Sequence, residues 1–198
     1  PVAELFPELS DSIILVDVTP NRGDALCVRG LARELAAKFS LKLKPQKLGR
    51  WKTPGANVNP TVENFDETFG FLACRVEGVK VQPSPAEWTQ FLESCGARAI
   101  NNLVDATNVV LFEYGHPIHF FDAEKVDAAS IQARFAKAGE SLKLLDGQSI
   151  QLHIEDLVIA DNNQVLSLAG VMGGAASAVS DSTTSIICLL YTSDAADE

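Results

Sequence analysis

The chain has 198 residues, 46% of them hydrophobic, and its 16 Lys and Arg against 26 Asp and Glu give a formal net charge of −10. This size and apolar content fit one large domain, or one domain with part of a neighbour. The excess of acidic residues argues against a general binding surface for DNA or other nucleic acids, because neutralising many phosphates requires an excess of Lys and Arg. No apolar run approaches membrane-spanning length and no cationic, apolar leader is present, so we expect a cytoplasmic protein without a membrane partner.

The first block of the chain combines one strand and one helix. A strand is predicted at residues 12–18, and the turn Thr19-Pro-Asn-Arg-Gly23 follows it. Asp24 is placed to cap the helix that comes next. The apolar stripe of that helix consists of Val28, Leu31, Leu35 and Phe39.

A linker is predicted after this block. Residues 45–60 hold three prolines and little hydrophobic periodicity. The basic residues between Lys42 and Lys52 are better explained as solvated connector than as a track for phosphates.

Two helices are predicted in the second block, after a strand at residues 69–76. Ser84-Pro-Ala-Glu87 matches a capping box with proline at the first helical position, and Gly96 ends this helix. The apolar face of the helix consists of Trp88, Phe91, Leu92 and Cys95. The second helix covers residues 102–114 and ends at Gly115. Its buried residues are predicted to be Leu103, Val104, Val110 and Leu111.

The remainder of the chain is predicted to be mostly strands. They lie at residues 131–135, 141–145, 150–152, 157–160 and 165–168. Asp146-Gly147 and Asp161-Asn162-Asn163 are hairpin signals. Helices followed by a run of strands predict an α+β fold rather than alternating parallel units.

The four cysteines show no paired spacing typical of a metal site, and nothing indicates a secreted protein. Cys27 and Cys95 fall on the apolar stripes of predicted helices, so we interpret them as small core hydrophobes. We therefore expect neither a disulfide framework nor a metal site.

The stretch from Asp105 to Asp122 has polar groups in unusual places. Thr107 and Asn108 stand inside a predicted helix although such residues are weak helix formers, and a Pro-stiffened turn then delivers His119 on a short strand. These groups could form the wall of a site. On these residues alone, a capped helix with a satisfied histidine behind it is the favoured interpretation, with Asp105 and Asp122 as structural cap and turn partners.

The glycines of Gly170-Val-Met-Gly-Gly174 are not followed by the Lys-Ser or Lys-Thr of a phosphate-binding loop, so we reject nucleotide binding there. They indicate a turn at which the backbone approaches another group closely.

Ten short motifs follow one another in a fixed order along residues 8–187. They are Asp17-Val-Thr-Pro-Asn-Arg-Gly-Asp24, Val28-Arg-Gly-Leu-Ala-Arg-Glu34, Cys95-Gly-Ala-Arg98, Val104-Asp-Ala-Thr-Asn108, Gly115-His-Pro-Ile-His119, Phe121-Asp122, Leu145-Asp-Gly147, Leu157-Val-Ile-Ala-Asp161, Leu168-Ala-Gly-Val-Met-Gly-Gly174 and Asp181-Ser-Thr-Thr184. In this order they resemble an internal section of the bacterial phenylalanyl-tRNA synthetase beta subunit that contains most of its tRNA-editing domain.

This resemblance implies a domain organisation. Residues 1–44 are expected to be part of a small N-terminal α+β domain, and residues 45–60 a linker. Residues 61–187 are expected to be the editing domain, a mixed, largely antiparallel sheet sandwich with flanking helices, truncated at its C-terminal end. Residues 188–198 resemble nothing in the family, and we interpret them as a tail of artefactual origin.

The resemblance also implies roles for individual residues. His119 matches the editing-site histidine, which would orient water or the terminal ribose. Arg98, Thr107 and Asn108 match residues that would bind substrate, although a surface ion pair (Arg98) or helix back-bonding and simple exposure (Thr107 and Asn108) are alternatives. In the loop, Gly173 and Gly174 would leave space and expose backbone amides to a bound amino acid.

Two departures from the family pattern stand out. His116 replaces a common glutamine and is interpreted as a neutral substitution at the rim that adds a titratable group. Leu189 stands where we align the glutamate that accepts the tyrosine hydroxyl in the family. Without that carboxylate, preference for tyrosine over phenylalanine should fall, so the chain alone is expected to be a weak or inactive editor.

The resemblance implies a parent enzyme that attaches phenylalanine to tRNA(Phe), with an editing domain that hydrolyses mischarged tyrosyl-tRNA(Phe). The family implies an alpha subunit that uses ATP and magnesium, a second beta subunit in a heterotetramer, and the acceptor end of tRNA(Phe) as partners; no cofactor is expected in this chain. The alternatives are a structural or assembly module without activity and a free-standing trans-editing hydrolase.

Overall fold

The fold of the described chain is α+β, as the order of predicted elements indicated. The structure, a computed structural model, describes residues 12–45, 58, 60–63 and 68–193. The helices are α2 (Val28–Phe39), α3 (Ala86–Ser94) and α4 (Asn102–Tyr114), with short 3-10 turns η2 (Gly23–Ala25) and η3 (Ala128–Ser130). The strands are β1 (Thr61–Val62), β2 (Thr68–Glu77), β3 (Ile118–Asp122), β4 (Gln132–Phe135), β5 (Ser141–Lys143), β6 (Ser149–Gln151), β7 (Leu157–Ala160), β8 (Val165–Leu168), β9 (Met172–Gly173) and β10 (Ser185–Ser193).

The strands form two sheets and a separate hairpin. One sheet has the order β1-β4-β7-β8-β9, in which β1 and β4 are parallel and the other pairs antiparallel. The other has the order β2-β10-β3 and is antiparallel throughout. The hairpin consists of β5 and β6, joined by the predicted turn at Asp146-Gly147.

Apolar residues pack the layers together. The first core lies between the two sheets and consists of Val58, Phe121, Ala123, Ile131, Ala133, Ile159, Leu166, Ile187 and Leu189. The second lies mainly between the five-stranded sheet and the β5–β6 hairpin and consists of Ala136, Leu142, Leu144, Leu152, Val158, Ala160 and Val165. Ile159 belongs to the first core and its neighbours Val158 and Ala160 to the second, because successive strand residues face opposite sides. The five-stranded sheet is therefore packed on both faces.

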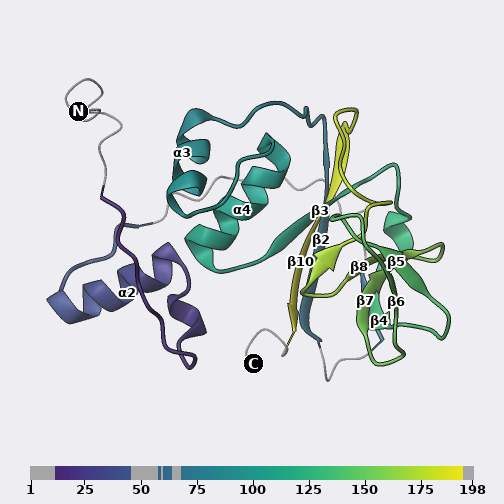
Figure 1. Ribbon diagram of the computed structural model, residues 1–198, viewed down its shortest axis with the longest axis horizontal. Coiled ribbons are helices and arrows are strands. Elements are labelled where there is room, and N and C mark those ends of the chain that lie inside the picture. Colours follow the sequence, from purple (N-terminus) through teal and green to yellow (C-terminus); the bar gives the residue numbers. More distant parts are fainter. Residues whose placement is uncertain (1–11, 46–57, 59, 64–67, 194–198) are drawn as a thin grey trace.

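Helices α3 and α4 lie beside the three-stranded sheet, on the side away from β4–β8 (Figure 1). Helix α4 spans the predicted residues: the Asn101 side chain accepts hydrogen bonds from the amides of Leu103 and Val104, and Gly115 ends the helix at φ 77°. From Gly115 the chain turns into β3, so the end of α4 fixes where β3 begins.

The first block differs from its prediction. Residues 12–18 form no regular strand, and Leu15 is 97% exposed, because none of the described strands pairs with this segment. Helix α2 is present, but Cys27 caps it, with its Sγ accepting the Gly30 amide, while Asp24 pairs with Arg22 instead. The predicted stripe is largely uncovered, since Leu35 and Phe39 are exposed.

Helix α3 also begins differently. The capping box is not formed, because the Ser84 hydroxyl donates to the carboxylate of Asp105 in α4 and the helix starts only at Ala86. Cys95 and Leu111 are exposed rather than buried. Cys27 is buried as expected, and all four thiols are free.

Two predicted boundaries also differ. Most of the predicted linker lies outside the described residues, but Val58 is buried in the first core, so this position belongs to the sandwich. Sequence analysis missed β1, β9 and β10. Strand β10 is the central strand of its sheet and runs to Ser193, which places residues 188–193 inside the fold rather than in a separate tail.

Asp105 ties α3 and α4 together, and its removal should destabilise the fold. Its side chain is fully buried and accepts hydrogen bonds from the Ser84 hydroxyl and the Ile100 amide. Asp105→Ala should lower the free energy of unfolding by about 2–3 kcal/mol, because both donors lose a charged acceptor. Urea denaturation measures this, with Glu93→Ala on the exposed side of α3 as the control, expected within about 0.5 kcal/mol of wild type. A loss no larger than that of the control would contradict this role.

The Arg134–Glu140 pair predicts a pH dependence. The buried Arg134 guanidinium donates to both oxygens of Glu140 at 2.9 and 2.7 Å, and this lowers the pKa of Glu140 despite partial burial of the carboxyl group. A lowered carboxyl pKa gives stability that is present above the usual Glu range, near pH ~4.3, and is lost as the pH falls below it.

Glu140→Gln should therefore cost about 2 kcal/mol at pH 7, and the difference from wild type should shrink as the pH drops through the acid range. Chemical denaturation at a series of pH values checks this, with the exposed Glu155→Gln as the control. A difference that stays constant with pH would show that the charge of Glu140 is not responsible.

Candidate functional site

His119 is the second residue of β3, where it faces the first core. Its strand neighbour on β10 is Leu189, directly opposite in register, and its ring meets Phe121 edge-on, with centroids 4.7 Å apart and an interplanar angle of 72°. Because His119 and Phe121 are two residues apart, both side chains project from the same face of the sheet. The predicted strand therefore delivers the histidine between the two sheets.

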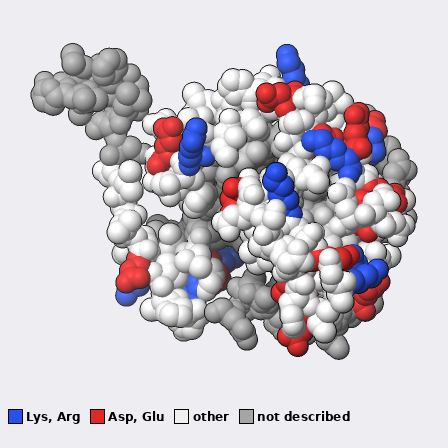
Figure 2. Space-filling model, turned by 45° about the vertical axis from the view of Figure 1, so that its right-hand side comes forward, with Lys and Arg blue, Asp and Glu red and all other residues white. Residues whose placement is uncertain are grey.

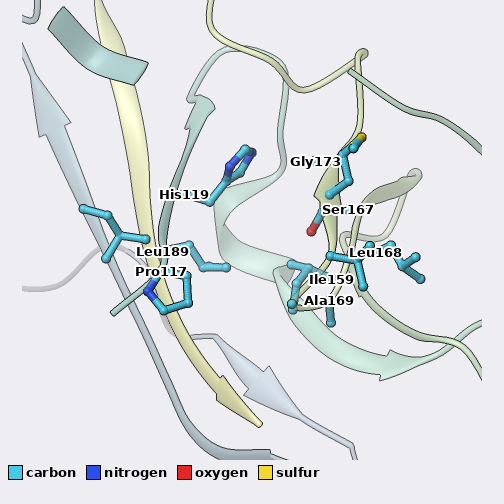
Figure 3. A pocket seen from close by; sticks show the side chains of 12 residues that line it. Pro117, His119, Ile159, Ser167, Leu168, Ala169, Gly173 and Leu189 are labelled. Atoms are coloured by element: carbon cyan, nitrogen blue, oxygen red, sulfur yellow. The ribbon is translucent and has the colours of Figure 1, made fainter. Parts of the chain in front are cut away.

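Gly173 provides the space that the His119 ring occupies. A Cβ atom at position 173 would lie 2.7 Å from both Cε1 and Nε2 of His119, and 3.2 Å from Cδ1 of Leu145. Figure 3 shows the imidazole on one side of this gap and Gly173 on the other. The absence of a side chain at Gly173 is thus required by the close approach of the histidine.

Two hollows adjoin the His119 ring. The first, about 170 Å³, lies between the two sheets, and the second, about 310 Å³, is lined by parts of α4, β3, the β5–β6 turn and the segment after β9. The first is lined by Pro117, Ile118, His119, Ile159, Ser167, Leu168, Ala169, Gly170, Val171, Met172, Gly173 and Leu189. The second is lined by Val104, Thr107, Asn108, Ile118, His119, Phe120, Leu145, Ala178 and Val179. His119 is the one titratable side chain among these lining residues.

The buried Nε2 atom of the half-buried His119 side chain has no polar partner among the described residues. Its Nε2 makes no hydrogen bond to any described residue, although most buried polar atoms in proteins have a partner. Burial lowers the pKa of His119 below its ordinary value, so the ring is neutral at neutral pH. A neutral imidazole nitrogen can donate or accept, depending on the tautomer, and here that capacity is unused within the described part of the chain.

Thr107 and Asn108 line the second hollow together with His119, as the local pattern and the family resemblance suggested. The Thr107 hydroxyl donates to the Val104 carbonyl at 2.7 Å, which is the helix back-bonding considered as an alternative. The half-buried Asn108 amide has no hydrogen-bond partner among the described residues. Asn108 is therefore the freer of the two polar groups to meet a ligand.

Three further residues are not brought into these hollows. Arg98 is exposed, lines neither of them and forms no ion pair with a described residue. The Gly174 amide donates to the Leu166 carbonyl at 2.8 Å, and a Cβ at this position would lie 2.6 Å from that oxygen. The prediction that this amide is exposed to a ligand is therefore wrong. His116 is exposed just after α4.

Sequence analysis missed the apolar walls. Leu168, Met172 and Ile159 were assigned only to strands, to the loop or to family motifs. Leu145 was assigned to the end of a strand and to a family motif, and none of these residues was predicted as a site residue. No local pattern marks these residues, because they meet only when the two sheets and the hairpin pack. Leu189 was noted only through the family resemblance, and the register of β10 brings it opposite His119.

Other site types find no support in the described residues. They contain no group of three or more His, Cys, Asp or Glu side chains arranged to hold a metal ion. None of the described helices is both long and apolar enough to cross a bilayer.

The chain matches one domain family and is similar to several curated proteins of one kind. The B3/4 domain family matches residues 69–195. The chain is similar to the phenylalanine--tRNA ligase beta subunit of Anaeromyxobacter dehalogenans (strain 2CP-C), at 44% identity over 190 residues, covering 94% of this chain and 24% of that protein. It is 41% identical over 183 residues to that of Carboxydothermus hydrogenoformans, covering 90% and 23%. The chain thus spans about a quarter of the length of these curated relatives.

A solved structure shares the fold. It is an N-terminal fragment of the phenylalanyl-tRNA synthetase beta-subunit from Pyrococcus horikoshii, with a TM-score of 0.55 at 15% identity, covering 87% of this chain and 53% of that one. At this level of identity the likeness concerns the fold alone.

The contact between His119 and Gly173 can be tested by adding one methyl group. Gly173→Ala should displace the imidazole, because the new Cβ would overlap two ring atoms, and the His119 ring signals in NMR spectra should shift strongly. Gly23→Ala is the control, because no atom lies within 4 Å of its Cβ position. Unchanged His119 signals in the Gly173→Ala chain would contradict the described geometry.

Proposed function

This chain belongs to the B3/4 domain family, and we propose that its two hollows beside His119 form a post-transfer editing site that hydrolyses mischarged tyrosyl-tRNA(Phe). Its homologues are beta subunits of phenylalanine--tRNA ligase, a ligase component. The observation that carries the proposal is the buried Nε2 of His119, which has no hydrogen-bond partner among the described residues although this side chain lines both hollows. A buried polar atom in this state is costly unless a ligand or water completes it.

The geometry suits hydrolysis of an ester. Water must attack the carbonyl carbon, and the ribose oxygen leaves with a proton. A neutral imidazole can hold the water or the ribose hydroxyl by one hydrogen bond, and burial keeps His119 neutral at the working pH. The Asn108 amide, on the same hollow, can supply a further hydrogen bond to the ester or the ribose.

Selectivity depends on the position opposite His119. Phenylalanine and tyrosine differ by one hydroxyl, and an apolar pocket rejects such a difference only about 100-fold. Leu189 is buried in the wall of the first hollow and offers the phenol no acceptor, whereas the family resemblance places a glutamate here. We therefore expect this chain to discriminate poorly between tyrosine and phenylalanine and to be a weak editor on its own.

The wider assembly is part of the same proposal. We expect an alpha subunit that uses ATP and magnesium, a second beta subunit in the heterotetramer, the acceptor end of tRNA(Phe) as substrate, and a cytoplasmic location. Lys and Arg are interspersed with Asp and Glu on the face shown in Figure 2. With a net charge of −10, this chain is expected to contact tRNA only locally, with other parts of the assembly supplying most phosphate contacts.

Deacylation of tyrosyl- and phenylalanyl-tRNA(Phe) tests the proposal. Leu189→Glu should hydrolyse tyrosyl-tRNA(Phe) about tenfold faster than wild type without a comparable gain on phenylalanyl-tRNA(Phe), because the new carboxylate accepts the phenol. Adding His119→Ala to that variant should abolish the gain. Leu189→Gln, which has a neutral acceptor of similar size, is the matched control and should gain less.

Circular dichroism tests whether each variant is folded, because Leu189→Glu places a carboxylate at a buried position. If the folded Leu189→Glu chain acts on neither substrate, or acts equally well with His119→Ala, the hollows are not an editing site. The region would then be a structural module of the subunit.

A further inference from the structure

The β5–β6 hairpin is hydrogen-bonded to the segment that contains Gly173. The Leu145 amide donates to the Gly173 carbonyl at 3.1 Å, the Ala175 amide donates to the Lys143 carbonyl at 2.8 Å, and Leu144 forms an antiparallel bridge with Gly174. Leu142 and Leu144 are buried in the second core. The backbone of the hairpin turn is therefore fixed at Leu145, although this residue is on the surface.

The Leu145 side chain and the imidazole both lie close to one point beside Gly173. Cδ1 of Leu145 is 3.2 Å from the position that a Cβ of residue 173 would take, and Cε1 and Nε2 of His119 are 2.7 Å from that position. Leu145 and His119 also line the second hollow together. Leu145 is 51% exposed, so it lies on the solvent side of this point.

Polar contacts do not hold the His119 ring in place. Histidines at functional sites are usually oriented by a hydrogen bond on the second ring nitrogen. Among the described residues, no hydrogen bond to either nitrogen of His119 is present. The orientation of the ring must therefore come from packing, and the contacts available are the edge of Phe121, the backbone at Gly173 and the side chain of Leu145.

We propose that Leu145 is a positioning residue for His119: held by the hairpin, its side chain covers the solvent side of the imidazole and keeps the ring in the place where it lines both hollows. This gives the β5–β6 hairpin a role at the site that its turn sequence does not reveal. The importance of this role for hydrolysis rests on the proposed function, whereas the positioning itself does not.

NMR titration of the His119 ring in the 198-residue chain tests the positioning directly. Truncation by Leu145→Ala should admit water to the ring and move its titration midpoint upward, toward the ordinary histidine value near ~6.5. Leu145→Val should move it less, and Leu145→Met, which fills the same space, should restore the wild-type midpoint. No other titratable side chain lines the hollows, so a change reports on the surroundings of His119 itself.

Ile154→Ala is the matched control, because Ile154 is a similarly exposed aliphatic residue, 57% against 51%, that lines neither hollow. It should leave the midpoint unchanged. A wild-type midpoint in Leu145→Ala overturns the proposal, as does an equal movement in Leu145→Met. If Leu145→Ala is unfolded, the Val and Met variants decide in the same way.

Deacylation separates this inference from the proposed function. In the Leu189→Glu background, Leu145→Ala should slow hydrolysis of tyrosyl-tRNA(Phe) about tenfold or more and Leu145→Met should retain it, since small displacements of a catalytic group are costly. If His119-dependent hydrolysis is absent altogether, the proposed function fails and the titration still decides the role of Leu145. If hydrolysis depends on His119 but is unaffected by Leu145→Ala, the positioning role fails.

Discussion

The close packing of His119 against Gly173 is the contact on which the rest of the site depends. Because residue 173 is glycine, the imidazole of His119 can lie against the backbone of β9, at a distance where any Cβ would overlap it. His119 belongs to the three-stranded sheet and Gly173 to the five-stranded sheet, so this contact joins the two layers. Both hollows adjoin this contact, and the Leu145 side chain lies beside it.

The site combines a rigid frame with an unsatisfied group. Both sheets and the hairpin are packed by apolar cores on either side of the five-stranded sheet. Within that frame the buried Nε2 of His119 lacks a partner among the described residues, at a cost of about 1–3 kcal/mol to the folded state. A fold can tolerate that loss when the remaining packing is sufficient, and buried polar groups left without a partner are typical of functional sites. The same burial that costs stability keeps the imidazole neutral and able to meet a ligand.

Local signals predicted most of the individual elements. Helix α4 and strands β7 and β8 were placed residue by residue, because caps, periodicity and hairpin turns act over short distances. Ser84 was wrongly predicted to cap α3, because its hydroxyl donates to the carboxylate of Asp105, 21 residues away. Residues 12–18 were wrongly predicted as a strand, because a strand needs a pairing partner that its own sequence does not show. At the site, the helix pattern and the family resemblance pointed to His119, Thr107 and Asn108, which line one hollow together, but the surroundings of Gly174 and Leu145 depend on how the hairpin packs against β9. Those contacts arise only in the folded chain.

The central claim is that the hollows beside His119 receive the 3′ end of an aminoacylated tRNA. The most direct measurement is an NMR titration of the isotope-labelled chain with 3′-tyrosylamino-3′-deoxyadenosine, an amide analogue that cannot be hydrolysed as an ester. We expect saturable shifts confined to residues that line the two hollows, His119 and Asn108 among them. Shifts located elsewhere, or none at millimolar analogue, would contradict it.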